Sequence, residues 1–301
     1  MRIAVTGRQG QVAQSLLERA PKAGIDIITI GRPDIDLSEP TGIEATLRAR
    51  KVDAVISAAA YTAVDLAESE SDIAEAVNVT GAGAIGRAAQ QLGIPVVHLS
   101  TDYVFDGTLD RPYREDDFTG PTSVYGRTKL DGERAIAAAS SDHAILRTAW
   151  VYSPFGKNFA RTMLRLASTR EEVSVVADQQ GTPTNALDIA DAAITVAKNL
   201  RTQPTANMRG VFHMTSSGEA SWADFAEAIF AASREVGGPI ARVIRIPSSA
   251  YPTPAKRPAS SRLDSSRLAE IHAVRLPRWQ DTLPSTIARL VAQEFQGKAS
   301  S

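Results

Sequence analysis

A tyrosine and a lysine, placed one helical turn apart, are the first residues of this chain whose spacing suggests chemistry. Residues 123–133 read SVYGRTKLDGE, so Tyr125 stands four positions before Lys129 in a segment with a helical pattern. Side chains at this spacing share one face of a helix. A free tyrosine has a pKa near ~10, and a close ammonium lowers that pKa by favouring the phenolate. The pair could therefore donate a proton to a developing alkoxide, although a packed tyrosine beside a solvated lysine would show the same spacing.

A hydroxyl precedes this pair at the end of a predicted strand. Residues 95–102 read PVVHLSTD, an apolar run that ends at Thr101 and Asp102. In a doubly wound sheet the carboxyl ends of the strands face the ligand crevice. We expect Thr101 and Tyr125 to converge on one substrate oxygen. His98, inside the same run, is interpreted as a core histidine rather than a catalyst.

Short apolar runs alternate with Ala-rich segments of helical period through the first half of the chain. Runs that are apolar throughout are typical of strands buried on both faces. With right-handed crossovers, this order predicts an α/β fold with a Rossmann-like, doubly wound parallel sheet. The strands are predicted at residues 3–7, 26–31, 53–60, 95–102 and 144–152.

The second half has a looser pattern and suggests a different role. We expect residues 1–150 to form an NAD(P)-binding domain and residues 151–301 to form mainly a smaller α/β substrate-binding region, with some segments returning to the first domain. Helices are predicted at 158–168, 185–200 and 221–233. The Pro/Ser-rich segment 247–264 is too long for a plain connection in a compact domain, so we expect it to be functional or disordered. The last five residues, GKASS, are expected to fray.

Composition excludes several classes of protein. The 301 residues carry 33 Lys and Arg against 34 Asp and Glu, which argues against nucleic acid as a partner. The chain has no cysteine, which excludes disulfides, thiolate nucleophiles and cysteine-based metal sites. No apolar stretch approaches the ~18–20 residues that span a bilayer, and the first residues do not read as a signal peptide. We expect a soluble, cytoplasmic protein that does not bind membranes.

A glycine loop follows the first predicted strand. Residues 6–12 read TGRQGQV, directly before a predicted helix. Gly7 permits a tight turn with positive φ, and Gly10 lets the backbone approach a pyrophosphate at the helix N-terminus. The spacing is Gly-x-x-Gly, with Ala13 where a third glycine often stands. A plain β–α turn is the alternative.

The neighbouring loops suggest which dinucleotide binds. Arg8 in the glycine loop and Arg32 after the second strand could clamp a ribose 2′-phosphate, which favours NADPH. Asp34 and Asp36 leave NADH possible, because an acid at this corner can bind the 2′-hydroxyl. The small residues Ala58, Ala59 and Ala60 leave room for a flat ligand, or serve only tight helix–sheet packing. Lys129 would also reach the nicotinamide ribose.

Seven stretches between Thr6 and Asp264 together resemble the extended short-chain dehydrogenase/reductases. Within that family the chain is similar to the branch that reduces dTDP-linked 4-keto-6-deoxysugars. The resemblance implies that NAD(P)H gives hydride to the C4 ketone of dTDP-4-dehydro-L-rhamnose, that Tyr125 gives the proton, and that dTDP-L-rhamnose results. The stretches are TGRQGQV, AAAYTAVDLAE, LSTDYVFDG, YGRTKLDGE, RTAWVY, DQQGTPT and RPASSRLD.

The resemblance also implies roles for single residues. The catalytic set would be Thr101, Tyr125 and Lys129. The sugar pocket would be lined by Asp102, Tyr103 and Trp150. Three groups of residues would contact the cofactor. The pyrophosphate loop would be Gly10, Gln11 and Val12, and the pair beside the adenine would be Asp36 and Leu37. The backbone that follows this pair in the family would be that of Ala58, Ala59 and Ala60.

Each pocket residue also has a structural interpretation. Trp150 offers a flat apolar wall but could be a core tryptophan, and Tyr103 could equally belong to the core. Asp102 could fix a sugar hydroxyl or cap the following turn. Arg257 and Arg262, in the Pro-rich segment, could hold the substrate diphosphate.

Some members of this family form a magnesium-bridged dimer through glutamates. At the matching positions this chain has Ser15 and Leu187. No His/Asp/Glu cluster with metal spacing occurs elsewhere in the sequence, so we expect no metal and either a monomer or a homodimer.

Two other functions are compatible with the same motifs. One is a nucleotide-sugar epimerase or dehydratase with retained NAD, although no glutamate follows Thr101. The other is a non-catalytic nucleotide-binding subunit, which an intact set of Thr101, Tyr125 and Lys129 argues against.

Overall fold

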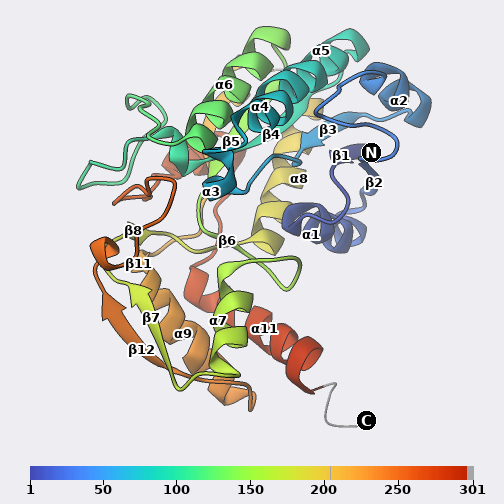
Figure 1. Ribbon diagram of the computed structural model, residues 1–301. Helices are drawn as coiled ribbons and strands as arrows, with labels where there is room; N and C mark the ends of the chain where they lie inside the picture. Colours follow the sequence, from blue (N-terminus) through green and yellow to red (C-terminus); the bar gives the residue numbers. More distant parts are fainter. Residues whose placement is uncertain (204, 297–301) are drawn as a thin grey trace.

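The protein is built around a six-stranded parallel sheet, seen in a computed structural model that describes residues 1–203 and 205–296 (Figure 1). The strand order is β10-β5-β4-β3-β1-β2, and every neighbouring pair is parallel. The predicted doubly wound sheet is therefore confirmed. Its strands are β1 (Arg2–Thr6), β2 (Asp26–Ile30), β3 (Ala54–Ser57), β4 (Val96–Thr101), β5 (His143–Thr148) and β10 (Gly210–His213).

Both faces of the sheet are covered by helices, which explains why its strands are apolar throughout. On β1, Ile3 and Val5 pack into one core and Ala4 packs into another, and all three are fully buried. One face is covered by α1 (Gln11–Arg19), α8 (Ala186–Thr202) and α10 (Ser266–His272). The other face is covered by α2 (Ile43–Arg50), α5 (Ala82–Leu92) and α6 (Val124–Ala139).

The connection from β3 to β4 contains several short helical pieces. Here α3 (Val64–Ala67) and α4 (Ser71–Glu75) lead into a π-helical turn at Ala76–Gly81, which continues as α5. The connection is therefore divided into short consecutive pieces rather than formed by one continuous α-helix.

The second half of the chain contributes to the first core. Strand β10 lies beside β5 at the edge of the sheet, and helix α8 packs against α1. Residues 210–213 and 186–202 thus belong structurally to the parallel sheet and its helical layer.

The remaining elements form a second core below the sheet (Figure 1). Strands β7 (Glu172–Val176) and β12 (Arg242–Ile246) pair in parallel. They pack with α7 (Phe159–Ala167), α9 (Trp222–Glu235) and α11 (Trp279–Val291), around buried side chains such as Tyr152, Phe225 and Trp279.

The structure departs from the sequence prediction at three places. The predicted strand 144–152 is divided into β5 and β6 (Val151–Tyr152), because Trp150 has a φ of 48° that breaks the extended backbone. Helices α10 and α11 were not predicted, and α11 contains Pro284.

The tail at 297–301 lies outside the described residues. Within the described ranges, no helix is both long and apolar enough to cross a bilayer.

Two glycines let helix α6 approach its neighbours closely. A Cβ on Gly126 would lie 2.2 Å from the carbonyl oxygen of Tyr103, and one on Gly132 would lie 2.1 Å from that of Asn78. Real Cβ atoms do not approach carbonyl oxygens this closely, so α6 can take its place only with glycine at both positions. The helix that carries Tyr125 and Lys129 therefore lies in close backbone contact with the turn that follows β4 and with the π-helical turn Ala76–Gly81.

Substitution of one of these glycines should destabilise the fold. We expect Gly132→Ala to lower the free energy of unfolding by at least ~1–3 kcal/mol, because the added methyl forces α6 away from Asn78. Gly120→Ala, whose Cβ would have its nearest neighbour at an ordinary 3.5 Å, is the control. Denaturant unfolding measures both, and equal stabilities for the two variants would contradict the close approach.

Candidate active site

The N-terminus of helix α6 places Tyr125 beside the end of strand β4. Ser123 caps this helix by accepting a hydrogen bond from the Gly126 amide at 3.2 Å. Tyr125 lies in the first turn, and its ring meets that of Tyr103 edge-on, with 5.5 Å between centroids. Tyr103 follows Thr101 by two residues, so the strand end and the helix start meet at these rings.

Thr101 and Tyr125 lie close together, as predicted. The Thr101 side chain accepts from the Tyr103 amide at 3.3 Å and donates to Asp102 Oδ1 at 3.0 Å. Burial raises the pKa of Tyr125 well above its ordinary value of 10.0, and the neighbouring Thr101 hydroxyl, which acts to lower this pKa, has the smaller effect. The predicted lowering of this pKa by Lys129 is therefore wrong, because desolvation penalises the phenolate more than its partners stabilise it.

Lys129 points to the strand rather than to the phenol. Its ammonium donates to the carbonyl oxygen of Leu99 at 2.7 Å and lies 3.4 Å from His98 Nε2. The side chain is 3% exposed, and burial lowers the pKa of Lys129 from 10.5 to about 8. At neutral pH the amine is still mostly protonated and fixes α6 to β4.

His98 is a core histidine, as predicted. Its Nδ1 lies 3.0 Å from Ser57 Oγ on the neighbouring strand β3. Burial lowers the pKa of His98 well below its ordinary value, and the Lys129 charge lowers it further. The imidazole is thus neutral and serves as a polar contact for Lys129.

A buried ion pair lies one turn further along α6. Glu133 and Arg147 side chains are each 4% exposed and form two hydrogen bonds, of 2.9 Å and 2.7 Å. Ser100, the residue before Thr101, donates to the same carboxylate. The guanidinium of Arg147 also lies 5.0 Å from the centroid of the Phe105 ring. The half-buried Tyr125 and the buried Lys129 and Glu133 thus repeat every four residues along one polar face of α6.

Asp102 is a buried carboxyl group at the centre of the site. It is 4% exposed, and burial raises its pKa from 3.8 to about 6, although the neighbouring Ser261 and Thr101 side chains act to lower that pKa. Ser261 comes from the Pro/Ser-rich segment, so this segment closes one side of the site.

Trp150 forms a wall made of two stacked indoles. Its ring lies 3.6 Å from that of Trp222, nearly parallel at 8°. A Cβ on Gly181 would lie 2.4 Å from the Trp150 ring, so the indole is held between Gly181 and Trp222. The wall therefore joins the segments around β6, β8 (Gln180–Gly181) and α9.

The two loop arginines occupy different surroundings. Arg257 donates to the Tyr103 hydroxyl at 3.1 Å and forms an ion pair with Asp65 on α3 at 2.5 Å. Arg262 instead pairs with Glu219 at 3.3 Å and donates to the backbone of Asp110 at 2.6 Å. Arg257 thus lies beside Tyr103 at the site, and Arg262 lies in a separate cavity of about 260 Å³.

The glycine loop has the geometry that a pyrophosphate needs. Gly7 has a φ of 90°, and its amide donates to Ile30 at 2.7 Å. Gly10 caps helix α1 with its backbone alone, and open space lies where its Cβ would be. The first amides of α1 therefore face outward as donors for an anion, and Val12 packs into the core beneath them.

The residues after β3 leave space beside this loop. Ala58 and Ala59 donate their amides to Thr6 Oγ1, each at 2.9 Å, and Ala60 follows them. All three alanines are half-buried, and Ala58 and Ala59 also pack against the two cores of the sheet, so both interpretations of these residues stay open.

Both arginines that were predicted to bind a ribose 2′-phosphate are paired with acidic side chains. Arg8 pairs with Asp34 at 2.5 Å, and Arg32 pairs with Asp36 at 2.6 Å. The Arg32 guanidinium holds the pKa of the Asp36 carboxyl well below its usual range. Leu37 is buried, and its carbonyl oxygen lies 2.5 Å from where a Cβ on Gly81 would be.

At the two positions where some family members carry metal-binding glutamates, this chain has a serine that hydrogen-bonds within its own helix and an apolar leucine. Ser15 is fully buried and donates to the Gln11 carbonyl at 2.8 Å, and Leu187 is buried in the first turn of α8. Across residues 1–203 and 205–296, no group of three or more His, Cys, Asp or Glu side chains could hold a metal ion.

Comparison with known proteins identifies the family. The family model described as RmlD substrate binding domain matches residues 1–292. A dTDP-4-dehydrorhamnose reductase from Sinorhizobium fredii is 50% identical over 282 residues, which cover 94% of this chain and 95% of that protein. The chain belongs to the dTDP-4-dehydrorhamnose reductase family. The resemblance inferred from the sequence motifs is thereby confirmed, and it favours a reductase over the epimerase, dehydratase and regulatory-subunit alternatives.

Solved structures of the family have the same fold as this chain. The dTDP-4-dehydrorhamnose reductase from Clostridium acetobutylicum superposes with a TM-score of 0.87 at 34% identity, covering 95% of this chain and 98% of its own. The dTDP-4-dehydrorhamnose reductase from Bacillus anthracis, solved in complex with NADP, has a TM-score of 0.86 at 31% identity, again covering 95% and 98%.

Several contributors to the site were not identified from the sequence. Glu133 could have been found, because it repeats the four-residue spacing of Tyr125 and Lys129. Arg147, Ser261 and Trp222 carry no such local signal, because only the tertiary fold brings them to the strand ends.

The buried Asp102 should give the protein a distinctive pH dependence. Its folded pKa is raised, so the unfolded chain ionises first, and stability is lost as pH rises from 4 through 6. We expect Asp102→Asn to remove this loss and to gain up to ~3 kcal/mol over wild type between pH 4 and 7. Urea unfolding at each pH measures the difference.

Asp106→Asn is the control for this measurement. A hydrogen bond from Tyr113 lowers the pKa of Asp106, so its contribution to stability is lost as pH falls instead. Parallel pH–stability curves for wild type and Asp102→Asn would contradict the burial of an ionisable Asp102.

Proposed function

We propose that this protein catalyses the NADPH-dependent reduction of the C4 ketone of dTDP-4-dehydro-L-rhamnose to dTDP-L-rhamnose, a step of dTDP-rhamnose and polysaccharide biosynthesis. The observation that carries the proposal is the meeting of Thr101 and Tyr125 at the carboxyl end of β4, with Lys129 buried behind them. Family membership supports the same reaction.

The catalytic residues act on one oxygen. A bound nicotinamide supplies the hydride. Because burial keeps the Tyr125 phenol protonated at neutral pH, it can donate its proton when negative charge develops on the C4 oxygen. The Thr101 hydroxyl holds the same oxygen in place. Lys129 fixes α6 to β4 and brings a positive charge near the site, which stabilises the developing anion.

The sugar is proposed to lie between Asp102, Tyr103 and Trp150. The stacked indole of Trp150 offers an apolar face to the deoxysugar. Asp102 can hold a sugar hydroxyl through a carboxyl group that is otherwise buried. We propose that Arg257 binds the substrate diphosphate near Tyr103, whereas Arg262 would have to leave its Glu219 partner to do so.

The cofactor is proposed to lie along the carboxyl edge of β1, β2 and β3. Its pyrophosphate would meet the free amides of α1 at Gly10, Gln11 and Val12, and its adenosine would lie near Asp36 and Leu37. Arg8 and Arg32 could then turn from their aspartates to a 2′-phosphate, which favours NADPH while leaving NADH usable.

The larger organisation is also a proposal. Residues 1–150 would bind the cofactor, and residues 151–301 would mainly bind the sugar nucleotide, apart from α8 and β10. We propose a cytoplasmic enzyme that acts as a monomer or homodimer without nucleic acid or metal.

A direct assay tests the proposed function. Purified protein, NADPH and dTDP-4-keto-L-rhamnose should together consume NADPH, measured by absorbance, and yield dTDP-L-rhamnose, identified by NMR. Absence of NADPH consumption, or a product epimerised without reduction, would refute it.

Removal of the Tyr125 hydroxyl should abolish most of the activity. We expect Tyr125→Phe to lower kcat by about 10²–10⁴-fold, the usual contribution of a general acid, while NADPH binding stays within about twofold of wild type. Tyr251→Phe, which alters an exposed ring, is the matched control. An unchanged kcat in Tyr125→Phe would mean that the proton comes from another group.

Arg32 should affect the choice of cofactor. We expect Arg32→Ala to raise the KM for NADPH about tenfold, because a charge-assisted contact to the 2′-phosphate is lost, and to leave the KM for NADH unchanged. Arg48→Ala, which breaks a similarly exposed ion pair with Glu44, is the control. Equal changes for both cofactors would place the 2′-phosphate elsewhere.

A further inference from the structure

A loop from the second half of the chain lies directly against the glycine loop. Residues 153–158 connect β6 to α7. The fully buried Ser153 hydroxyl lies 2.8 Å from Gln11 Oε1, and a Cβ on Gly156 would lie 3.4 Å from Gln11 Cγ and 4.0 Å from the Gln9 carbonyl oxygen. The first residue of α1 is therefore held from outside its own βα unit.

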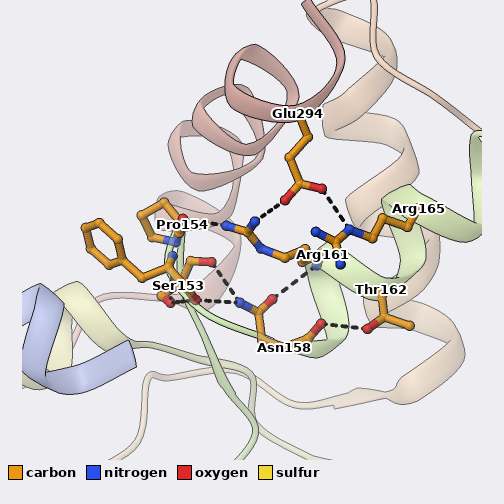
Figure 2. Close-up of polar contacts among 8 residues, drawn as sticks. Ser153, Pro154, Asn158, Arg161, Thr162, Arg165 and Glu294 are labelled. Atoms are coloured by element: carbon orange, nitrogen blue, oxygen red, sulfur yellow. Dashed lines mark hydrogen bonds and ion pairs between the residues drawn. The ribbon is translucent and has the colours of Figure 1, made fainter. Parts of the chain in front are cut away.

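The shape of this loop is set by Asn158 and Arg161 (Figure 2). Asn158 caps α7 by accepting from the Arg161 amide at 3.1 Å, and its amide nitrogen donates back to the carbonyls of Ser153 at 2.9 Å and Phe155 at 3.2 Å. The Arg161 guanidinium donates to the Pro154 carbonyl at 2.8 Å. Three successive loop carbonyls are thus fixed by two side chains of α7.

The C-terminal segment in turn fixes Arg161. Glu294, in the π-helical turn Ala292–Gln296, places one carboxylate oxygen on Arg161 and the other on Arg165, as Figure 2 shows. Glu294 is 15% exposed and Arg161 17%, whereas Arg165 is 59% exposed. The inner pair is largely removed from solvent, so its attraction is less screened than that of a surface pair.

A second contact from the same segment supports the loop. Arg289, on α11, binds Glu18 of α1 through two hydrogen bonds of 2.8 Å, and its guanidinium lies 5.3 Å from the Phe155 ring centroid. Helix α11 therefore contacts the 153–158 loop and also helix α1, whose N-terminus that loop approaches.

We propose that Glu294 and Arg161 are positioning residues for the cofactor diphosphate. They fix the 153–158 loop, whose Ser153 hydroxyl holds the Gln11 side chain and thereby the first turn of α1. The inference rests on the proposed cofactor site at Gly10, Gln11 and Val12. Holding the turn in its binding geometry before the ligand arrives reduces the cost of ordering it on binding, so the C-terminal turn contributes to cofactor affinity without touching the cofactor.

The test measures NADPH binding apart from catalysis. Titration of the full-length protein with NADPH, followed by nucleotide fluorescence, gives the Kd of wild type, Glu294→Gln, Ser153→Ala and the double variant. We expect each single variant to raise the Kd for NADPH about tenfold. This factor corresponds to the loss of about one hydrogen bond, because each change releases the first turn of α1 from the 153–158 loop. The double variant should be no worse than the weaker-binding single variant, because both act through Gln11.

Two controls separate positioning from general stability. Glu172→Gln removes an ion pair with Arg242 on the distant strands β7 and β12 and should leave the Kd unchanged. In the reductase assay at saturating NADPH, the kcat and the KM for the keto-sugar should stay at wild-type values in Glu294→Gln and Ser153→Ala. If Glu294→Gln does not fold, Arg161→Lys takes its place in the cycle, because lysine keeps the charge but cannot bridge Pro154 and Glu294 together.

The possible failures are distinguishable. Wild-type protein that binds no NADPH would refute the proposed function. Wild-type protein that binds NADPH, with single variants that bind equally well or whose effects simply add in the double variant, would overturn this inference and leave the proposed function intact.

Discussion

Three polar side chains on one face of helix α6 are the constraint on which the site depends: Lys129 and Glu133 are buried, and Tyr125 is half-buried. Tyr125, Lys129 and Glu133 all face strand β4, and each lies beside a polar group there or nearby: the Thr101 hydroxyl, the Leu99 carbonyl, and the Ser100 hydroxyl with Arg147. Buried polar and charged groups cost free energy unless they are paired. The helix and strand therefore have one relative position that satisfies all three groups, and that position brings the phenol to the threonine.

The same burial sets the protonation states that the reaction needs. Desolvation raises the pKa of Tyr125 and lowers that of Lys129 to about 8, so the proposed proton donor stays protonated while the amine keeps most of its charge at neutral pH. The second half of the chain completes the site from the other side, through Trp150, Ser261 and the 153–158 loop. Neither half alone holds both the reacting groups and the walls around them.

The sequence predicted the parallel sheet, the glycine loop and the closeness of Thr101 and Tyr125, because these depend on local periodicity and on the rule that ligands bind at the carboxyl ends of parallel strands. It did not predict the break at Trp150, where φ is positive and the ring lies between Gly181 and Trp222, residues that are distant in the sequence. Helix α11 had a readable pattern in Leu283, Ile287 and Leu290, with Pro284 as a contrary signal. The direction of the Tyr125 pKa shift required knowledge of burial, which spacing alone does not contain.

A crystal structure of the complex with NADP⁺ and dTDP-L-rhamnose tests the central claim most directly, through the distances from the sugar C4 oxygen to the hydroxyl oxygens of Thr101 and Tyr125. The account predicts that both distances fall within about 2.6–3.2 Å, hydrogen-bonding reach of one oxygen. Hydroxyl groups that point to different cavities, or a C4 oxygen bound by other side chains, would contradict it.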